Sequence, residues 1–234
     1  MNFYNLGRST LLGTLIGLQV GTQAGAQDCA RDAMLVFDGS ASMAEVSFDT
    51  SAPTRIEEAR AAVAQAMPQI APVRRVGLLT YGPGAEDSCR GIDLRFKPVV
   101  DASEPVIQAI NALEPFGLTP LTASVIAAAK ALDYQRAPGI IVLVTDGNET
   151  CGGRPCALGA ELATTAQDLT VHVIGFRVVF DPFSWNSPEA GAFTDGSSVA
   201  RCLSDQTGGI YVDTQTVDEL ADALRQTLGC AFVG

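Results

Sequence analysis

Short runs of apolar residues recur along the chain and predict strands that are buried on both faces of a sheet. The strongest run is Ile140–Val144 (IIVLV), and Ala33–Phe37 (AMLVF) has the same character. An acidic residue follows each run. Asp38 comes directly after Phe37, and Asp146 lies two residues after Val144. The segment Leu94–Lys97 alternates instead, which predicts an edge strand with one face in water. The predicted buried strands are 33–37, 76–81, 140–144, 171–176 and 210–213.

Between these strands, apolar residues recur at the spacing of a helix. The predicted helices cover 56–67, 107–113, 121–132, 155–167, 198–204 and 218–228. Alternation of helices with uniformly apolar strands predicts a doubly wound α/β fold, in which a mostly parallel sheet is flanked by helices. Ligands of such sheets bind beyond the carboxyl ends of the strands, which makes Asp38 and Asp146 the first candidates for a site.

The amino-terminal segment has the three-part layout of a secretory signal peptide. Met1–Arg8 carries one basic residue, Ser9–Val20 is apolar and uncharged, and Ala24-Gly25-Ala26 provides the small residues of a cleavage site. The apolar run is short for a membrane span, and no later stretch is long enough for one. We therefore expect a signal peptide at 1–26, a single domain at 27–234 without a transmembrane segment, and a secreted or periplasmic location.

Composition narrows the function classes. Hydrophobic residues make up 47% of the chain and charged residues 18%, which excludes a disordered protein. The formal net charge is −11, so the chain lacks the basic surface that nucleic acids and anionic membranes require. The single histidine, His172, lies in a predicted strand and argues against a Ser-His-Asp enzyme or a His-rich zinc site.

The six cysteines predict disulfides, because an exported chain folds in an oxidising compartment. Cys29 precedes the first strand, and Cys230 follows a last helix that should finish at the same end of the sheet. We therefore predict a Cys29–Cys230 bridge. Cys151 and Cys156 are candidates for a local bridge, which leaves Cys89 and Cys202 unassigned.

Three separated loops carry the chemistry. The first is a D-x-S-x-S pattern made by Asp38, Ser40 and Ser42, the second is Gly117-Leu118-Thr119-Pro120, and the third is Thr145-Asp146-Gly147. They offer hydroxyls and carboxylates, which are hard oxygen donors, with no histidine or cysteine among them. Such a set suits Mg²⁺, with Mn²⁺ or Ca²⁺ as alternatives.

The three loops together resemble the metal-ion-dependent adhesion site of the von Willebrand factor type A domain family. The resemblance extends from Ala33 to about Leu228, and Thr145–Cys156 further resembles a subset of bacterial exported members. It implies a six-stranded sheet ordered 3-2-1-4-5-6 with one antiparallel edge strand. It also implies that Ser40, Ser42 and Thr119 contact the ion directly, that Asp38 and Asp146 hold it directly or through water, and that a partner's acidic side chain completes the coordination.

Other residues near these loops are open to more than one interpretation. Glu149, three residues beyond Asp146, either adds charge near the ion or is a solvated loop acid, and the second interpretation is favoured. The loop between Arg177 and Val199 carries aromatic residues that form either a satellite cluster under the loop or a patch for docking a partner. These residues are Phe180, Phe183, Trp185 and Phe193.

Two classes of function fit these observations. The favoured one is a non-enzymatic adhesion module that captures a protein partner through the ion. The alternative is a Mg²⁺-dependent hydrolase or phosphoryl transferase, since a bound metal can activate water. Against the alternative, the sequence has no G-x-S-x-G, no phosphate-binding G-x-x-x-x-G-K and no suitable histidine base.

Overall fold

The computed structural model describes Met1 and residues 29–46, 52–84, 88–147, 149–178, 188–189 and 199–230. Residues 2–26 of the expected signal peptide lie outside this part of the chain. So do the four aromatic residues of the candidate docking patch, Phe180, Phe183, Trp185 and Phe193.

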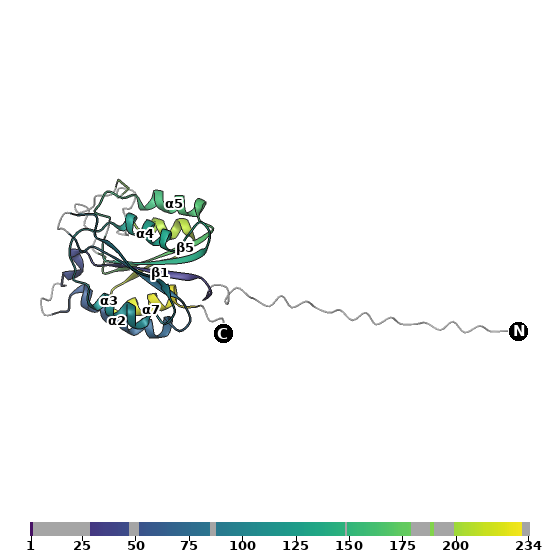
Figure 1. The fold of residues 1–234 in the computed structure, drawn as a ribbon, viewed down its shortest axis with the longest axis horizontal. Coiled ribbons are helices and arrows are strands. Elements are labelled where there is room, and N and C mark those ends of the chain that lie inside the picture. The colour runs from purple at the N-terminus through teal and green to yellow at the C-terminus, as the bar shows by residue number, and fades with distance from the viewer. Residues whose placement is uncertain are drawn as a thin grey trace.

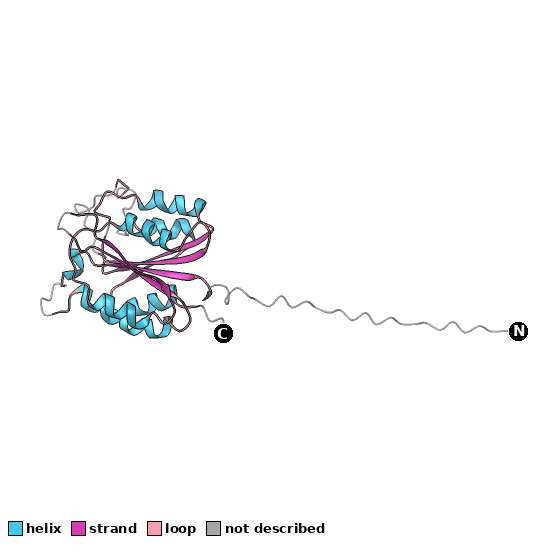
Figure 2. Ribbon diagram, in the orientation of Figure 1, coloured by secondary structure: helices cyan, strands magenta, loops and turns pink. Residues whose placement is uncertain are grey.

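A six-stranded sheet runs through the centre of the molecule (Figures 1 and 2). The strand order is β3-β2-β1-β4-β5-β6, with β2 and β3 antiparallel and all other neighbours parallel, which confirms the predicted fold class. The strands are β1 (Asp32–Asp38), β2 (Val76–Tyr81), β3 (Ile92–Val99), β4 (Pro138–Thr145), β5 (Asp168–Phe176) and β6 (Tyr211–Thr214).

Helices cover both faces of the sheet. Helices α2, α3 and α7 pack on one face and α4, α5 and α6 on the other (Figures 1 and 2). Their bounds are α2 (Arg55–Ile70), α3 (Ser103–Asn111), α4 (Leu121–Ala131), α5 (Pro155–Thr165), α6 (Arg201–Thr207) and α7 (Val217–Leu228), with a short 3₁₀ helix η1 at Ala41–Ala44. No helix in the described ranges is long and apolar enough to cross a membrane.

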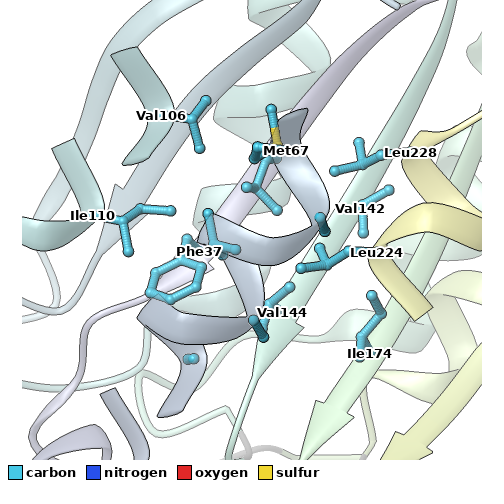
Figure 3. Packing of buried hydrophobic residues seen from close by; sticks show 14 of the residues in the cluster. Phe37, Met67, Val106, Ile110, Val142, Val144, Ile174, Leu224 and Leu228 are labelled. Atoms are coloured by element: carbon cyan, nitrogen blue, oxygen red, sulfur yellow. The ribbon is translucent and has the colours of Figure 1, made fainter. Parts of the chain in front are cut away.

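The central strands are apolar throughout because each side chain meets a helix layer on one face or the other. Along β1, Leu35 and Phe37 face α2, α3 and α7, whereas Met34 and Val36 face the opposite layer. Figure 3 shows Phe37 among Met67 of α2, Ile110 of α3 and side chains from β4 and α7. Alternate side chains on a strand point to opposite faces, so a strand covered twice cannot keep a polar face.

Strand register brings the ends of β1, β2 and β4 together at one edge. Phe37 pairs with Val144, and Asp38 pairs with Tyr81. Asp38 therefore leaves the sheet beside the Thr145-Asp146 turn that follows β4. The backbone register alone therefore places the first and third loops side by side at the carboxyl edge of the sheet.

The structure contains three disulfides. It joins Cys29 to Cys230, as predicted, with the two Cα atoms 5.3 Å apart. The candidate local bridge between Cys151 and Cys156 is wrong. Cys151 is joined to Cys89 in the β2–β3 loop, and Cys156 is joined to Cys202 of α6.

The physical reason for this correction is the close approach of two helices that sequence spacing does not reveal. Cys156 lies in the first turn of α5, and α5 packs tightly on α6. A Cβ atom on Gly159 of α5 would lie only 3.0 Å from the carbonyl oxygen of Cys202. The helix therefore presents Cys156 to α6, whereas Cys151 stays in the loop that faces Cys89.

Replacing Cys29 and Cys230 together with serine should lower the free energy of unfolding by about 5 kcal/mol, because the bridge closes a loop of 201 residues. The Cys156→Ser/Cys202→Ser pair is the matched control. It opens a loop of 46 residues, so the same chain-entropy relation gives a smaller loss of about 4 kcal/mol. Denaturant unfolding of the three proteins checks this order. A smaller loss for the Cys29/Cys230 pair than for the control would contradict it.

Candidate metal centre

Asp38 is held rigidly at the end of β1. Its side chain is fully buried, and its Oδ1 accepts a hydrogen bond from the backbone N–H of Ser40 at 2.8 Å. Its Oδ2 accepts hydrogen bonds from the hydroxyl groups of Tyr81, at 2.9 Å, and Thr145, at 2.8 Å. Burial, and then the charge of Asp38, raises the pKa of Tyr81 well above its usual value, so the phenol remains a donor. A carboxylate oxygen can accept about two hydrogen bonds. Oδ2 of Asp38 already accepts two, whereas Oδ1 accepts one and can still bind another group.

A glycine allows the first loop to sit this close to the end of β2. Gly82 has a φ of +113°, and a Cβ atom at this position would overlap the backbone of Gly39 and Ser40. Any side chain here would push the first loop away from the sheet edge.

The two serines link Asp38's loop to Asp146 through a chain of hydrogen bonds. The hydroxyl of Ser42 donates to Oδ1 of Asp146 at 2.8 Å, and the hydroxyls of Ser40 and Ser42 are 3.1 Å apart. Ser42 has a single hydroxyl proton and gives it to Asp146, so Ser40 must be the donor to Ser42. Four of the five predicted ligands thus lie in one connected cluster.

Asp146 is buried close to a second negative charge. Its side chain is wholly inaccessible, and its Oδ2 forms an ion pair with Nη1 of Arg55 at 2.9 Å. Burial, followed by the charge of Asp38, raises the pKa of Asp146 to about 7, although Ser42 and Arg55 oppose this shift. The edge of the sheet therefore carries more negative charge than its surroundings compensate, and positive charge would stabilise it.

Thr119, the fifth predicted ligand, lies on the neighbouring loop before α4. Gly117 of this loop has a φ of +78°, and its carbonyl accepts a hydrogen bond from the N–H of Ala41 at 3.1 Å. Thr119 is buried, and its backbone exchanges hydrogen bonds with Thr150. Among the described residues, no hydrogen bond joins the Thr119 hydroxyl to the other four ligands. Main-chain contacts between the loops bring it to the same edge.

Glu149 is buried, contrary to its interpretation as a solvated loop acid. Its carboxylate accepts hydrogen bonds from the backbone N–H groups of Thr122, in the first turn of α4, and Cys151, both at 2.8 Å. It therefore caps α4 and fixes the third loop against the second. Sequence could not show this because Thr122 lies 27 residues earlier in the chain.

The donors at this edge are two carboxylates and three hydroxyls. Within the described ranges, no group of three or more His, Cys, Asp or Glu side chains gathers as a metal site. A site here would thus depend on hydroxyl oxygens as much as on carboxylates. These donors, together with the excess negative charge around Asp146, fit a hard divalent cation.

The sequence model of the von Willebrand factor type A domain matches residues 33–149, half of the chain. The matched segment contains all three loops of the site. The chain belongs to the von Willebrand factor type A domain family. This membership and the sheet topology agree with the resemblance drawn from the three loops.

This von Willebrand factor type A domain is similar to the uncharacterised protein YwmD of Bacillus subtilis, with 29% identity over 117 residues. The match covers 49% of this chain and 46% of YwmD, so the chain spans less than half of this relative.

Solved structures share its fold at low sequence identity. The pilus adhesin SpaC of Lactobacillus rhamnosus GG has a TM-score of 0.61 at 15% identity, over 85% of this chain and 30% of SpaC. Proximal thread matrix protein 1 from the mussel byssus, with a zinc-occupied MIDAS motif, has a TM-score of 0.55 at 15% identity, over 86% of this chain and 46% of its own.

Replacing Glu149 with glutamine should destabilise the fold by about 1–3 kcal/mol, because a buried N–H group loses a charged acceptor. The matched control is Glu161→Gln, which changes an exposed residue of α5 and should alter stability by less than about 0.5 kcal/mol. Thermal or urea unfolding of both variants measures the difference. Equal stability of the two variants would show that the carboxylate does not fix the loop.

Proposed function

We propose that this domain binds a divalent cation through Asp38, Ser40, Ser42, Thr119 and Asp146 and uses it to capture a protein partner through an acidic side chain. The observation that carries the proposal is the cluster at the carboxyl edge, where the buried carboxylates of Asp38 and Asp146 are connected through the backbone N–H of Ser40 and two serine hydroxyls. A bound cation would supply an open coordination position for an oxygen ligand of the partner.

The donors favour Mg²⁺, with Mn²⁺ and Ca²⁺ as the alternatives. All five side chains offer oxygen, and softer metals generally take nitrogen or sulfur ligands. The zinc-occupied MIDAS motif of the mussel protein, which shares this fold, supports a cation site in this domain and makes Zn²⁺ a useful comparison in binding experiments.

Charge supports an acidic group as the ligand from the partner. The chain carries a formal net charge of −11, so it would repel an acidic partner over most of its surface. A cation at the sheet edge reverses this sign locally. The shared fold of the pilus adhesin SpaC supports a role in protein binding.

We further propose that the domain binds without turnover. His172, the single histidine, lies in β5, where its Nδ1 accepts a hydrogen bond from the backbone N–H of Ile210 at 3.1 Å. The histidine thus has a structural role away from the three loops. Incubating the Mg²⁺-loaded protein with p-nitrophenyl phosphate and p-nitrophenyl acetate tests the alternative, because turnover that disappears in Asp146→Asn would establish a hydrolase.

Export is the third part of the proposal. Disulfides are typical of oxidising compartments, and this chain has three. We expect the exported protein to begin at Gln27 after removal of the signal peptide. Intact mass spectrometry of the secreted or periplasmic protein checks the cleavage, and a product that retains residues 1–26 would contradict it.

Replacing Thr119 with valine should weaken Mg²⁺ binding by about tenfold or more, because it removes an oxygen ligand while keeping the shape of the side chain. Asp146→Asn should weaken binding further, since it also removes a charge. Titration calorimetry with Mg²⁺, Mn²⁺, Ca²⁺ and Zn²⁺ provides the measurement.

Thr122→Val is the matched control for Thr119→Val. It removes a threonine hydroxyl one turn further along, whose buried oxygen has no hydrogen-bond partner among the described residues. Binding should remain at the wild-type level in this control. Wild-type protein that binds none of Mg²⁺, Mn²⁺, Ca²⁺ and Zn²⁺ would overturn the proposal. So would partner capture from an extract that is equal in Mg²⁺ and in chelator.

A further inference from the structure

Arg55 is the one cation among the described residues that pairs with Asp146. It is the first residue of α2, and a capping box made by Thr54 and Glu57 fixes the start of this helix. The Arg55 side chain is only 11% exposed. Its position is therefore set by the helix rather than by a flexible surface loop.

One guanidinium nitrogen of Arg55 contacts three oxygens of the site. Nη1 lies 2.9 Å from Oδ2 of Asp146, 3.1 Å from the carbonyl oxygen of Ser42 and 3.0 Å from Oε2 of Glu45. Two of these residues, Asp146 and Ser42, are proposed metal ligands, although the contact with Ser42 is to its backbone carbonyl. The third, Glu45, is largely exposed.

We propose that Arg55 is an internal counter-ion that competes with the divalent cation for Asp146 and so sets the concentration at which the site loads. This inference rests on the proposed function, because it concerns the same cation site. Arg55 itself is a positioning residue, and it acts on the cation through the carboxylate of Asp146.

The competition follows from the hydrogen bonds that Asp146 already makes. Its Oδ1 accepts from Ser42 and its Oδ2 from Arg55, so part of its capacity as a ligand is in use before a cation arrives. The positive charge of Arg55 also repels a second cation nearby, and this repulsion is strong because the pair is buried. Both effects weaken cation binding.

The same contact stabilises the protein without a cation. Asp38 and Asp146 are like charges in a buried place, and losing a partner from a buried ion pair is costly. Arg55 offsets part of this repulsion until a divalent cation takes over. When Asp146 binds the cation, the guanidinium of Arg55 keeps its hydrogen bonds to Glu45 and to the carbonyl oxygen of Ser42.

Arg55→Gln tests this competition because it removes the charge. At pH 8, which limits proton competition for Asp146, the variant should bind Mg²⁺ about tenfold more tightly than wild type. Arg55→Lys keeps the charge and should stay close to wild type. Titration calorimetry gives the affinities.

Thermal unfolding separates this role from a merely structural one. Arg55→Gln should melt below wild type in chelator, and the difference should shrink in saturating Mg²⁺. Arg60→Gln is the control on the same helix, because Arg60 donates to the carbonyl groups of Ile110 and Leu113. Its loss of stability should be the same with and without Mg²⁺.

The outcomes distinguish this inference from the proposed function. If wild type binds Mg²⁺ and Arg55→Gln binds no more tightly, or its loss of stability persists in Mg²⁺, the inference alone is overturned. If wild type binds Mg²⁺, Arg55→Gln binds it about tenfold more tightly, and the variant's loss of stability shrinks in Mg²⁺, the inference is supported. If neither protein binds, the proposed function fails and the inference fails with it.

Discussion

The site is organised around the repulsion between two buried carboxylates. Asp38 is the last residue of β1 and Asp146 follows β4, and the register of these adjacent parallel strands brings their ends together, so the topology itself creates the unfavourable interaction. The surrounding groups are mainly donors that reduce its cost. Tyr81, Thr145 and the Ser40 N–H hold Asp38, and Ser42 and Arg55 hold Asp146. Such a concentration of negative charge is poor for stability alone, which is why it indicates a site.

The three loops keep this arrangement because each is fastened to a neighbour. The backbones of Gly39 and Ala41 hydrogen-bond to the loop before α4, and Glu149 connects that same region to the loop after β4. The Cys89–Cys151 disulfide ties the loop after β4 to the β2–β3 loop, and the Cys156–Cys202 disulfide ties the start of α5 to α6. A ligand set that is fixed in advance loses less conformational entropy when it binds.

The helices and strands could be predicted from sequence, and so could the grouping of Asp38, Ser40 and Ser42 in the first loop, because their signals are local. An apolar run such as Ile140–Val144 must be covered on both faces, and hydroxyls at alternate positions after Asp38 fall in one turn. Glu149, Arg55 and the partners of Cys151 could not be found in this way. Each acts on a group far along the chain, such as Asp146 for Arg55, and nothing in the nearby residues indicates the contact. The predicted helix begins at Ile56, one residue after Arg55, and helical spacing does not say where the guanidinium of Arg55 reaches.

The presence of Arg55 also bears on what a loaded site would attract. When both carboxylates are ionised, they and the guanidinium leave one negative charge at the sheet edge, and a divalent cation would change it to one positive charge. Glu45 is exposed, so water screens most of its contribution. Without Arg55 the loaded edge would be close to neutral, and an acidic side chain would gain little from approaching it. Arg55 would therefore oppose binding of the cation and favour binding of an acidic partner, because it would keep the loaded site positive within a strongly acidic protein. Weaker cation binding and stronger attraction of an acidic partner would then be two results of the same buried charge.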